Sequence, residues 1–190
     1  MIHTPDGSFA CTVPTPGSHM VSNALAGAAV GYVLGLDSEQ IRAGIEHLPF
    51  LPGRNNIIQT DRFMILDDCY NANPVSMNAA IDVLDLGIGR KVAIVGKMGE
   101  LGSNEKELHY QVGAHLAASK TDVVIAVDEL AREIIRAIKD AGSDIETHWF
   151  ASKEELLPLL GSIVKEGDNI LVKASNSLGF REIVSALEKL

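Results

Sequence analysis

The chain has 190 residues, 46% of them hydrophobic, and a formal net charge of −9 at pH 7. This composition is typical of a globular protein with a sizeable core, and an acidic chain with scattered Lys and Arg offers no basic surface for a nucleic-acid backbone. Residues 24–36 form the longest apolar stretch, which is too short to span a bilayer, so we expect neither nucleic acid nor a membrane as partner.

The two cysteines, Cys11 and Cys69, show neither metal-ligand spacing nor a disulfide framework. Such usage is typical of a reducing compartment. The first residues also lack the basic and apolar regions of a signal peptide. The sequence therefore predicts a cytoplasmic location.

The first fifty residues do not share the alternation of strands and helices that the rest of the chain shows. We expect a strand within residues 8–14, a helix rich in small residues over 17–36, and a second helix over 38–47 that Asp37 caps. One strand and two helices bury too little surface to fold alone, so this part is expected to be the tail of a larger domain. Residues 48–53 would be the hinge or linker.

Short β-branched runs alternate with amphipathic segments from residue 52 onward. Strands are predicted at 64–66, 92–95, 123–127, 147–150 and 170–172. Helices are predicted at 75–86, 105–118, 129–141, 153–166 and 180–189, with Asp128 and Ser152 as N-caps. The alternation predicts an α/β fold with a Rossmann-like, mostly parallel sheet and helices on both faces.

Residues 67–74, with the sequence DDCYNANP, form a polar loop between a predicted strand and a predicted helix. The loop holds two carboxylates and two amides, and Pro74 suits the first turn of the following helix. On local grounds a capped turn with solvated acids and a ligand-binding loop are equally compatible with this segment. The wider arrangement has to decide between them.

Ligands bind outside the carboxyl ends of the strands in an open parallel sheet. Acids, amides and two lysines are expected to meet there, at positions 67–73, 96–98, 128 and 173–176. Such a set suits a ribose diol and a carboxylate. The chain has no GxxxxGK[ST] or GxGxxG motif and no Ser-His-Asp or metal-ligand cluster, so it carries no phosphate cradle of its own.

Several motifs in family order resemble those of the Mur ligases, which are ATP-dependent amide ligases of peptidoglycan synthesis. The similar segments are DDCYNANP at 67–74, GR at 53–54, GSHMVSNALA at 17–26, MGELG at 98–102, LH at 108–109 and VKAS at 172–175. The resemblance implies that residues 1–52 are the remnant of a central ATPase domain with its linker, and that residues 53–190 are the C-terminal domain. It also implies that the N-terminal and central domains, including the P-loop and the magnesium ligands, belong to the rest of the polypeptide.

The resemblance further implies ATP with magnesium, and UDP-N-acetylmuramoyl-tripeptide and D-alanyl-D-alanine as substrates. Asn23 would contact the adenine, Arg54 the phosphates and Asp68 the ribose hydroxyls. The dipeptide would meet the side chains Asn71, Asn73, Lys173 and Ser175. The implied reaction is phosphorylation of the tripeptide carboxylate, attack of the dipeptide amine and formation of an amide. No catalytic residue proper is expected on this chain, and the chain alone is expected to be inactive.

The chain departs from the pattern of the Mur ligases at four positions. Lys97 stands where an acid is usual, Ala174 replaces a Gly, Asn176 replaces an Arg and Met20 replaces an Asn. These differences fall around the expected ligands.

Two other functions remain open from the sequence. A phospho-receiver domain would also place an acidic pair, an Asp and a Lys at strand ends, as Asp67, Asp68, Asp128 and Lys173 do. A free-standing nucleotide-binding module differs from the ligase only in what else the polypeptide contains.

Single residues also have purely structural interpretations. Lys173 would pair with Asp67 or Asp68 instead of binding a ligand. His109, Cys69 and Trp149 are expected to have structural roles.

Overall fold

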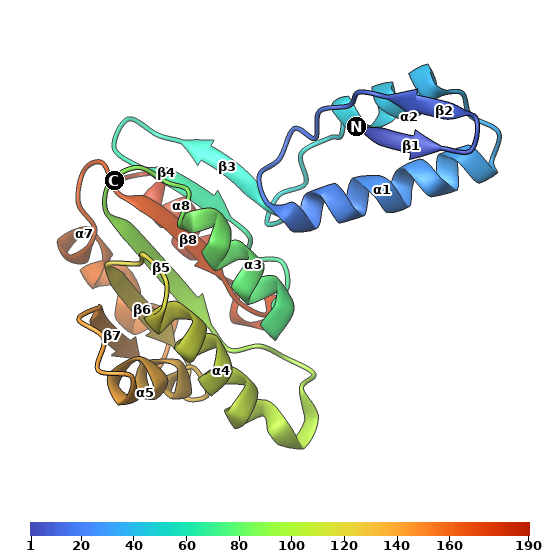
Figure 1. Ribbon diagram of the computed structural model, residues 1–190. Coiled ribbons are helices and arrows are strands. Elements are labelled where there is room, and N and C mark those ends of the chain that lie inside the picture. Colours follow the sequence, from blue (N-terminus) through green and yellow to red (C-terminus); the bar gives the residue numbers. More distant parts are fainter. The chain divides into compact units, whose positions relative to one another are not determined.

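The computed structural model describes residues 1–190, which divide into two compact units, Met1–Phe50 and Leu51–Leu190. Each unit is described by itself. Helices and strands of both are labelled in Figure 1. None of the helices combines the length and the apolar composition needed to cross a membrane.

The first unit consists of a β-hairpin and two helices. The hairpin pairs β1 (Ile2–Thr4) with β2 (Gly7–Phe9), and the helices are α1 (Ser18–Val33) and α2 (Ser38–Glu46). Both predicted helices are confirmed. The predicted strand at 8–14 is wrong in extent, because only its first residues pair, and the strand β1 opposite them was missed.

Helix α2 begins with the predicted cap. Asp37 accepts a hydrogen bond from the backbone N–H of Gln40 at 2.8 Å, and the Gln40 side chain accepts from the N–H of Asp37 at 3.0 Å. This reciprocal pair satisfies two of the helix's otherwise free donors. The core of the unit is small, because only Ile2, Ala28 and Ile41 are buried in it.

The second unit is built on a six-stranded sheet with the strand order β3-β4-β8-β5-β6-β7. The strands are β3 (Asn56–Gln59), β4 (Met64–Asp67), β5 (Lys91–Gly96), β6 (Val123–Val127), β7 (Glu146–Phe150) and β8 (Asn169–Lys173). All five predicted strands are confirmed, and they are mutually parallel. The edge strand β3, which pairs antiparallel with β4, was missed.

Six helices flank this sheet: α3 (Pro74–Leu84), α4 (Glu105–Ala117), α5 (Arg132–Asp140), α6 (Lys153–Leu156), α7 (Leu160–Ile163) and α8 (Arg181–Leu187). Short 3₁₀ helices lie at Gly102–Asn104, Leu157–Leu159 and Asn176–Leu178. The predicted helix at 153–166 is interrupted, because Pro158 lacks an N–H and is accommodated in a 3₁₀ turn between α6 and α7.

Two predicted caps do not form. Helix α5 begins at Arg132, and Asp128 instead takes a positive φ of 95° at the end of β6. Its carboxylate accepts from the N–H of Leu130 at 3.1 Å, which makes a local turn. Ser152 precedes α6 in an extended conformation but makes no capping hydrogen bond.

The sheet is covered on both faces (Figure 1). Alternate strand residues such as Ala93 and Val95 belong to a core with α3, α4 and α5, whereas Val92 and Ile94 belong to a core with α6, α7 and α8. This alternation follows from the two-residue period of a strand. The predicted fold class, a mostly parallel sheet with helices on both faces, is confirmed.

The strand order also decides against a phospho-receiver. Taken in chain order, the five parallel strands lie in the order first, fifth, second, third, fourth. Receiver domains such as CheY have the order second, first, third, fourth, fifth. The receiver interpretation is therefore wrong.

The contact between α4 and α5 yields a prediction on stability. A Cβ on Gly113 of α4 would lie 2.4 Å from the carbonyl oxygen of Ile134 in α5. We expect Gly113→Ala to lower the free energy of unfolding by about 1–3 kcal/mol, although alanine favours a helix. Urea unfolding followed by the fluorescence of Trp149, the single tryptophan, measures this in the second unit.

Ala114→Ser is the matched control, because it adds one heavy atom at an exposed position of the same helix. It should cost no more than about 0.5 kcal/mol. Equal stabilities of the two variants would contradict the close packing of α4 against α5.

Candidate functional site

Asp67 is the last residue of β4 and is fully buried. Its Oδ2 atom accepts from the backbone N–H of Gly53 at 2.9 Å and forms an ion pair with Arg181. Its Oδ1 atom accepts from the thiol of Cys69 at 3.0 Å. A buried carboxylate is tolerated only with such partners. Asp67 therefore fixes the start of the 67–74 loop against the segment that precedes β3.

Cys69 is a structural residue of this loop, as expected. Burial raises the pKa of its thiol to about 12, and the hydrogen bond to Asp67 acts in the same direction. The thiol stays protonated at neutral pH and is a poor nucleophile.

Asp68 is the partly exposed member of the acidic pair, with 18% of its side chain accessible. Its Oδ1 atom accepts from the N–H of Asn55 at 2.9 Å, and its Oδ2 atom lies 2.5 Å from the Nζ of Lys173. Each carboxylate oxygen has two lone pairs, so both atoms retain acceptor capacity. Asp68 is thus held in place and still able to accept hydrogen bonds from hydroxyl groups.

Lys173 is only 2% exposed, and its ammonium is used within the chain. Besides Asp68 Oδ2, Nζ contacts the carbonyl oxygens of Asn71 at 2.9 Å and of Asp68 at 3.5 Å. An ammonium has three donors, and all three are engaged. Lys173 therefore presents no free donor to a ligand. Its ion pair with Asp68 agrees with the structural interpretation, in which this lysine pairs with Asp67 or Asp68.

Arg54 lies beside the same loop. Its guanidinium carbon lies 4.0 Å from the centroid of the Tyr70 ring. The N–H of Tyr70 donates to the carbonyl of Gly53 at 2.9 Å, and Gly53 has a φ of 76°. A Cβ on Gly53 would come within 3.1 Å of the Tyr70 nitrogen, so only glycine lets the two segments approach this closely.

The two asparagines of the loop differ in their roles. Asn73 caps α3: its Oδ1 accepts from the N–H of Ser76 at 2.9 Å, with Pro74 in the first turn. Asn71 is exposed, and its Oδ1 accepts from the N–H of Ala72 at 2.8 Å. The capped-turn interpretation is therefore confirmed for Asn73, whose side-chain NH₂ group remains for other partners.

Lys97 and Ser175 lie at the ends of neighbouring strands. The N–H of Ser175 donates to the carbonyl of Lys97 at 2.9 Å, and β5 pairs with β8. The Nζ of Lys97 lies 3.4 Å from Oδ2 of Asp128, with 35% of the lysine side chain exposed. Sequence reasoning placed position 97 at the correct edge but did not assign it a role.

His109 is completely buried beneath the segment that carries Lys97. Its Nε2 accepts from the N–H of Met98 at 2.8 Å, and its Nδ1 lies 2.6 Å from the carbonyl of Glu105. The first contact requires an unprotonated Nε2, and the second a protonated Nδ1, so the ring is neutral. Burial lowers its pKa. The expected structural role of His109 agrees with this geometry.

Asn23 lies on α1 in the first unit. It lines an apolar cavity of about 250 Å³ between α1 and α2, together with Met20, Gly27, Ile41 and Leu48. Its Nδ2 contacts the sulfur of Met20 at 3.6 Å. The side chain is exposed and makes no stronger hydrogen bond within the chain.

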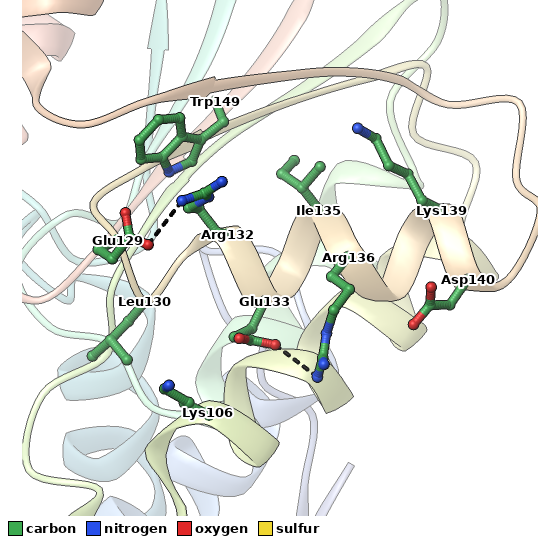
Figure 2. Close-up of a pocket in the computed structure, with 10 residues that line it drawn as sticks. All are labelled: Lys106, Glu129, Leu130, Arg132, Glu133, Ile135, Arg136, Lys139, Asp140 and Trp149. Carbon is green, nitrogen blue, oxygen red and sulfur yellow. Dashed lines mark hydrogen bonds and ion pairs between the residues drawn. The ribbon is translucent and has the colours of Figure 1, made fainter.

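A larger hollow of about 560 Å³ lies over α5 and holds none of the predicted site residues (Figure 2). Arg132 pairs with Glu129 at 2.9 Å and stacks 4.6 Å from the centroid of Trp149. The indole N–H of Trp149 donates to the carbonyl of Asp128 at 3.0 Å, as expected for a packing residue at the sheet edge. Both arginines of the hollow are paired with glutamates, Arg132 with Glu129 and Arg136 with Glu133, and we assign no ligand to this hollow.

Residues 53–176 match the family model described as "Mur ligase, glutamate ligase domain". The chain belongs to the Mur ligase family.

Among curated Mur ligases, UDP-N-acetylmuramoyl-tripeptide--D-alanyl-D-alanine ligase of Escherichia coli K12 is 38% identical over 99% of this chain and 41% of its own length. A solved structure of MurF from Acinetobacter baumannii matches with a TM-score of 0.89 and 32% identity, over 99% of this chain and 41% of the other. MurF from Thermotoga maritima, solved in complex with ADP, has a TM-score of 0.77 and 28% identity, over 92% and 39% of the two chains. The chain thus spans about two fifths of the length of these relatives.

His109 gives a pH prediction. The folded pKa lies below the ordinary value of 6.5, so the unfolded chain binds the extra proton first. The contribution of the neutral His109 to the free energy of unfolding is complete above pH 6.5. It is lost as the pH falls toward the pKa of the folded state, at up to about 1.4 kcal/mol per pH unit.

His109→Gln keeps an acceptor for Met98 but does not titrate. Urea unfolding between pH 7.5 and 5 should show the wild type losing more stability than the variant. Parallel pH curves for the two proteins would contradict the buried neutral imidazole.

Proposed function

We propose that this chain is the C-terminal part of an ATP-dependent ligase that joins D-alanyl-D-alanine to UDP-N-acetylmuramoyl-tripeptide in peptidoglycan synthesis. The observation that carries the proposal is the match of 99% of the chain, at 38% identity, to a relative named for that reaction. A free-standing nucleotide-binding module is the alternative. It lacks a comparable observation in its favour.

Residues 1–52 are proposed as the end of the central domain, and residues 53–190 as the C-terminal domain. Two features of the first unit support this division. Its core holds only three buried apolar residues, and Val30, Val33 and Leu34 at the end of α1 are 60–83% exposed. Exposed apolar surface of this kind marks a face that contacts another surface, which is proposed to be the rest of the central domain. The cytoplasm is the proposed compartment, because both cysteines are free thiols.

ATP is the proposed nucleotide, in keeping with the ADP complex of the Thermotoga relative. Asp68 has acceptor capacity for ribose hydroxyls, Arg54 carries an exposed guanidinium suited to phosphates, and Asn23 offers an amide suited to adenine. No group of three or more acidic, His or Cys side chains lies close enough to hold a metal ion. The magnesium ligands are therefore proposed to lie outside this chain.

Asn71, Asn73 and Ser175 are proposed to face the peptide substrate, and Lys173 to support them from behind the loop. In the proposed reaction the γ-phosphoryl group of ATP passes to the tripeptide carboxylate, the dipeptide amine attacks the acyl carbon, and phosphate leaves. The residues of this chain contribute positioning and charge compensation to that sequence.

Kinetics of the full-length polypeptide test the nucleotide role. Arg54→Ala and Asp68→Ala should each raise the ATP KM by roughly ten- to a hundredfold, because a hydrogen bond to a charged group contributes about 1.5–3 kcal/mol. The 190-residue chain alone should show no ATP-dependent ligation.

Arg132→Ala is the matched control, since Arg132 also stacks on an aromatic ring but lies in the hollow over α5 (Figure 2). It should leave the ATP KM unchanged. Ligation by the isolated chain would refute the proposed division of labour, and wild-type ATP kinetics in both site variants would remove Arg54 and Asp68 from the nucleotide site.

A further inference from the structure

Four arginines of the second unit lie over aromatic rings. Three of them also have a polar partner: Arg132 pairs with Glu129, Arg136 pairs with Glu133, and Arg62 donates to the carbonyl of Leu190 at 2.8 Å. Their rings, Trp149, Tyr110 and Phe63, therefore add to arginines that are already bound. The fourth arginine is Arg54, which lies over Tyr70.

The Arg54 guanidinium has the Tyr70 ring as its one partner. It lies 4.0 Å from the ring centroid and forms no hydrogen bond and no ion pair within the chain. A guanidinium carries five N–H donors, and contact with the face of a ring uses none of them. Arg54 is therefore held beside the 67–74 loop while all its donors stay available to an anion.

The two carboxylates of the loop do not draw Arg54 away from the ring. Asp67 pairs with Arg181, and Asp68 pairs with Lys173. Each acid thus has a cation of its own. Arg54 is the cation beside this loop whose charge no acid compensates.

The backbone on both sides of Arg54 is fixed to the same loop. The carbonyl of Gly53 accepts from the N–H of Tyr70 at 2.9 Å, and the N–H of Asn55 donates to Asp68 at 2.9 Å. The side chain of Arg54 is then the part that remains to be ordered. An arginine side chain has a large rotamer entropy to lose on binding, and a contact that restricts it beforehand strengthens the binding of a ligand.

We propose that Tyr70 is a positioning residue, which holds the Arg54 guanidinium in place for the phosphates of the nucleotide. The proposal rests on the proposed function, in which Arg54 binds those phosphates, and deepens it by naming the residue that orders this arginine. Tyr70 acts through the face of its ring, because its hydroxyl makes no hydrogen bond within the chain. The residue is 47% exposed, so the ring lies at the surface where a ligand arrives.

Steady-state kinetics of the full-length polypeptide test the proposal. Tyr70→Leu removes the ring and keeps the N–H and the Cβ that contact Gly53. It should raise the KM for ATP by about three- to tenfold, as expected for the loss of a cation–π contact near the surface. The KM for D-alanyl-D-alanine and for UDP-N-acetylmuramoyl-tripeptide should change by less than about twofold.

Two further variants show whether the ring face is the cause. Tyr70→Phe keeps that face and should restore the ATP KM to within about twofold of wild type. Tyr110→Leu is the matched control, because Tyr110 also lies over an arginine, Arg136, but this arginine is paired with Glu133. It should leave the ATP KM unchanged. An ATP KM that rises equally in Tyr70→Phe and Tyr70→Leu would overturn the proposal.

A double-mutant cycle with Arg54→Ala separates positioning from a general effect of the ring. In the Arg54→Ala background, Tyr70→Leu should change the ATP KM by less than about twofold, because the group that it positions is gone. Equal effects of Tyr70→Leu in both backgrounds would show that the ring acts independently of Arg54. A lowered melting temperature with an unchanged ATP KM would assign Tyr70 a purely structural role. Either result overturns the proposal.

Calorimetric titration with ATP, without the peptide substrates, makes the test independent of turnover. Tyr70→Leu should weaken ATP binding by the same factor of about three to ten. If the wild type binds ATP but ligates no dipeptide, the proposed function fails, and the binding cycle still tests Tyr70. An active wild type with unchanged ATP binding in Tyr70→Leu refutes the further inference alone, and a wild type that binds no ATP refutes both.

Discussion

Two adjacent carboxylates at the end of β4 are the constraint on which the candidate site depends. Asp67 is buried and Asp68 is partly exposed, and each accepts one backbone N–H from the segment before β3, at Gly53 and Asn55. Each also meets a cation from the last quarter of the chain, Arg181 or Lys173. Burying a carboxylate is costly unless it is paired and hydrogen-bonded. These partners therefore join three distant segments into one structure.

The same pairing decides which groups are left for ligands. Because Lys173 is committed to Asp68 and to the carbonyl of Asn71, it shapes the 67–74 loop from within. Asp68 retains lone pairs, and Lys97 retains donors. Asp68 follows β4 and Lys97 follows β5, and β8 lies between these two strands. The two groups therefore do not compete for the same partner.

Much of the fold was predictable because its strands are buried on both faces and appear as β-branched runs, as in residues 123–127. Strand β3 was missed because it is short and its sequence, NIIQ, places two isoleucines side by side and shows no alternation. The sequence predicts Asp128 as a helix cap, whereas the residue has a positive φ, which its side-chain type does not reveal. The sequence predicted the position of the loop at the edge of the sheet. It did not predict that Lys173 is buried, because the partner of this lysine, Asp68, lies 105 residues earlier in the chain. Long-range pairing of this kind depends on the packed sheet.

The most direct test of the account is a double-mutant cycle on the free energy of unfolding with Lys173→Met and Asp68→Asn, followed by Trp149 fluorescence. The single tryptophan lies in β7 of the same unit and reports its unfolding. Lys173→Met leaves Asp68 and the Asn71 carbonyl without their cation, so we expect the double variant to be less destabilised than the sum of the single variants, by about 1–3 kcal/mol. Additive effects would show that the two residues act independently and would contradict the paired carboxylates as the organising element of this site.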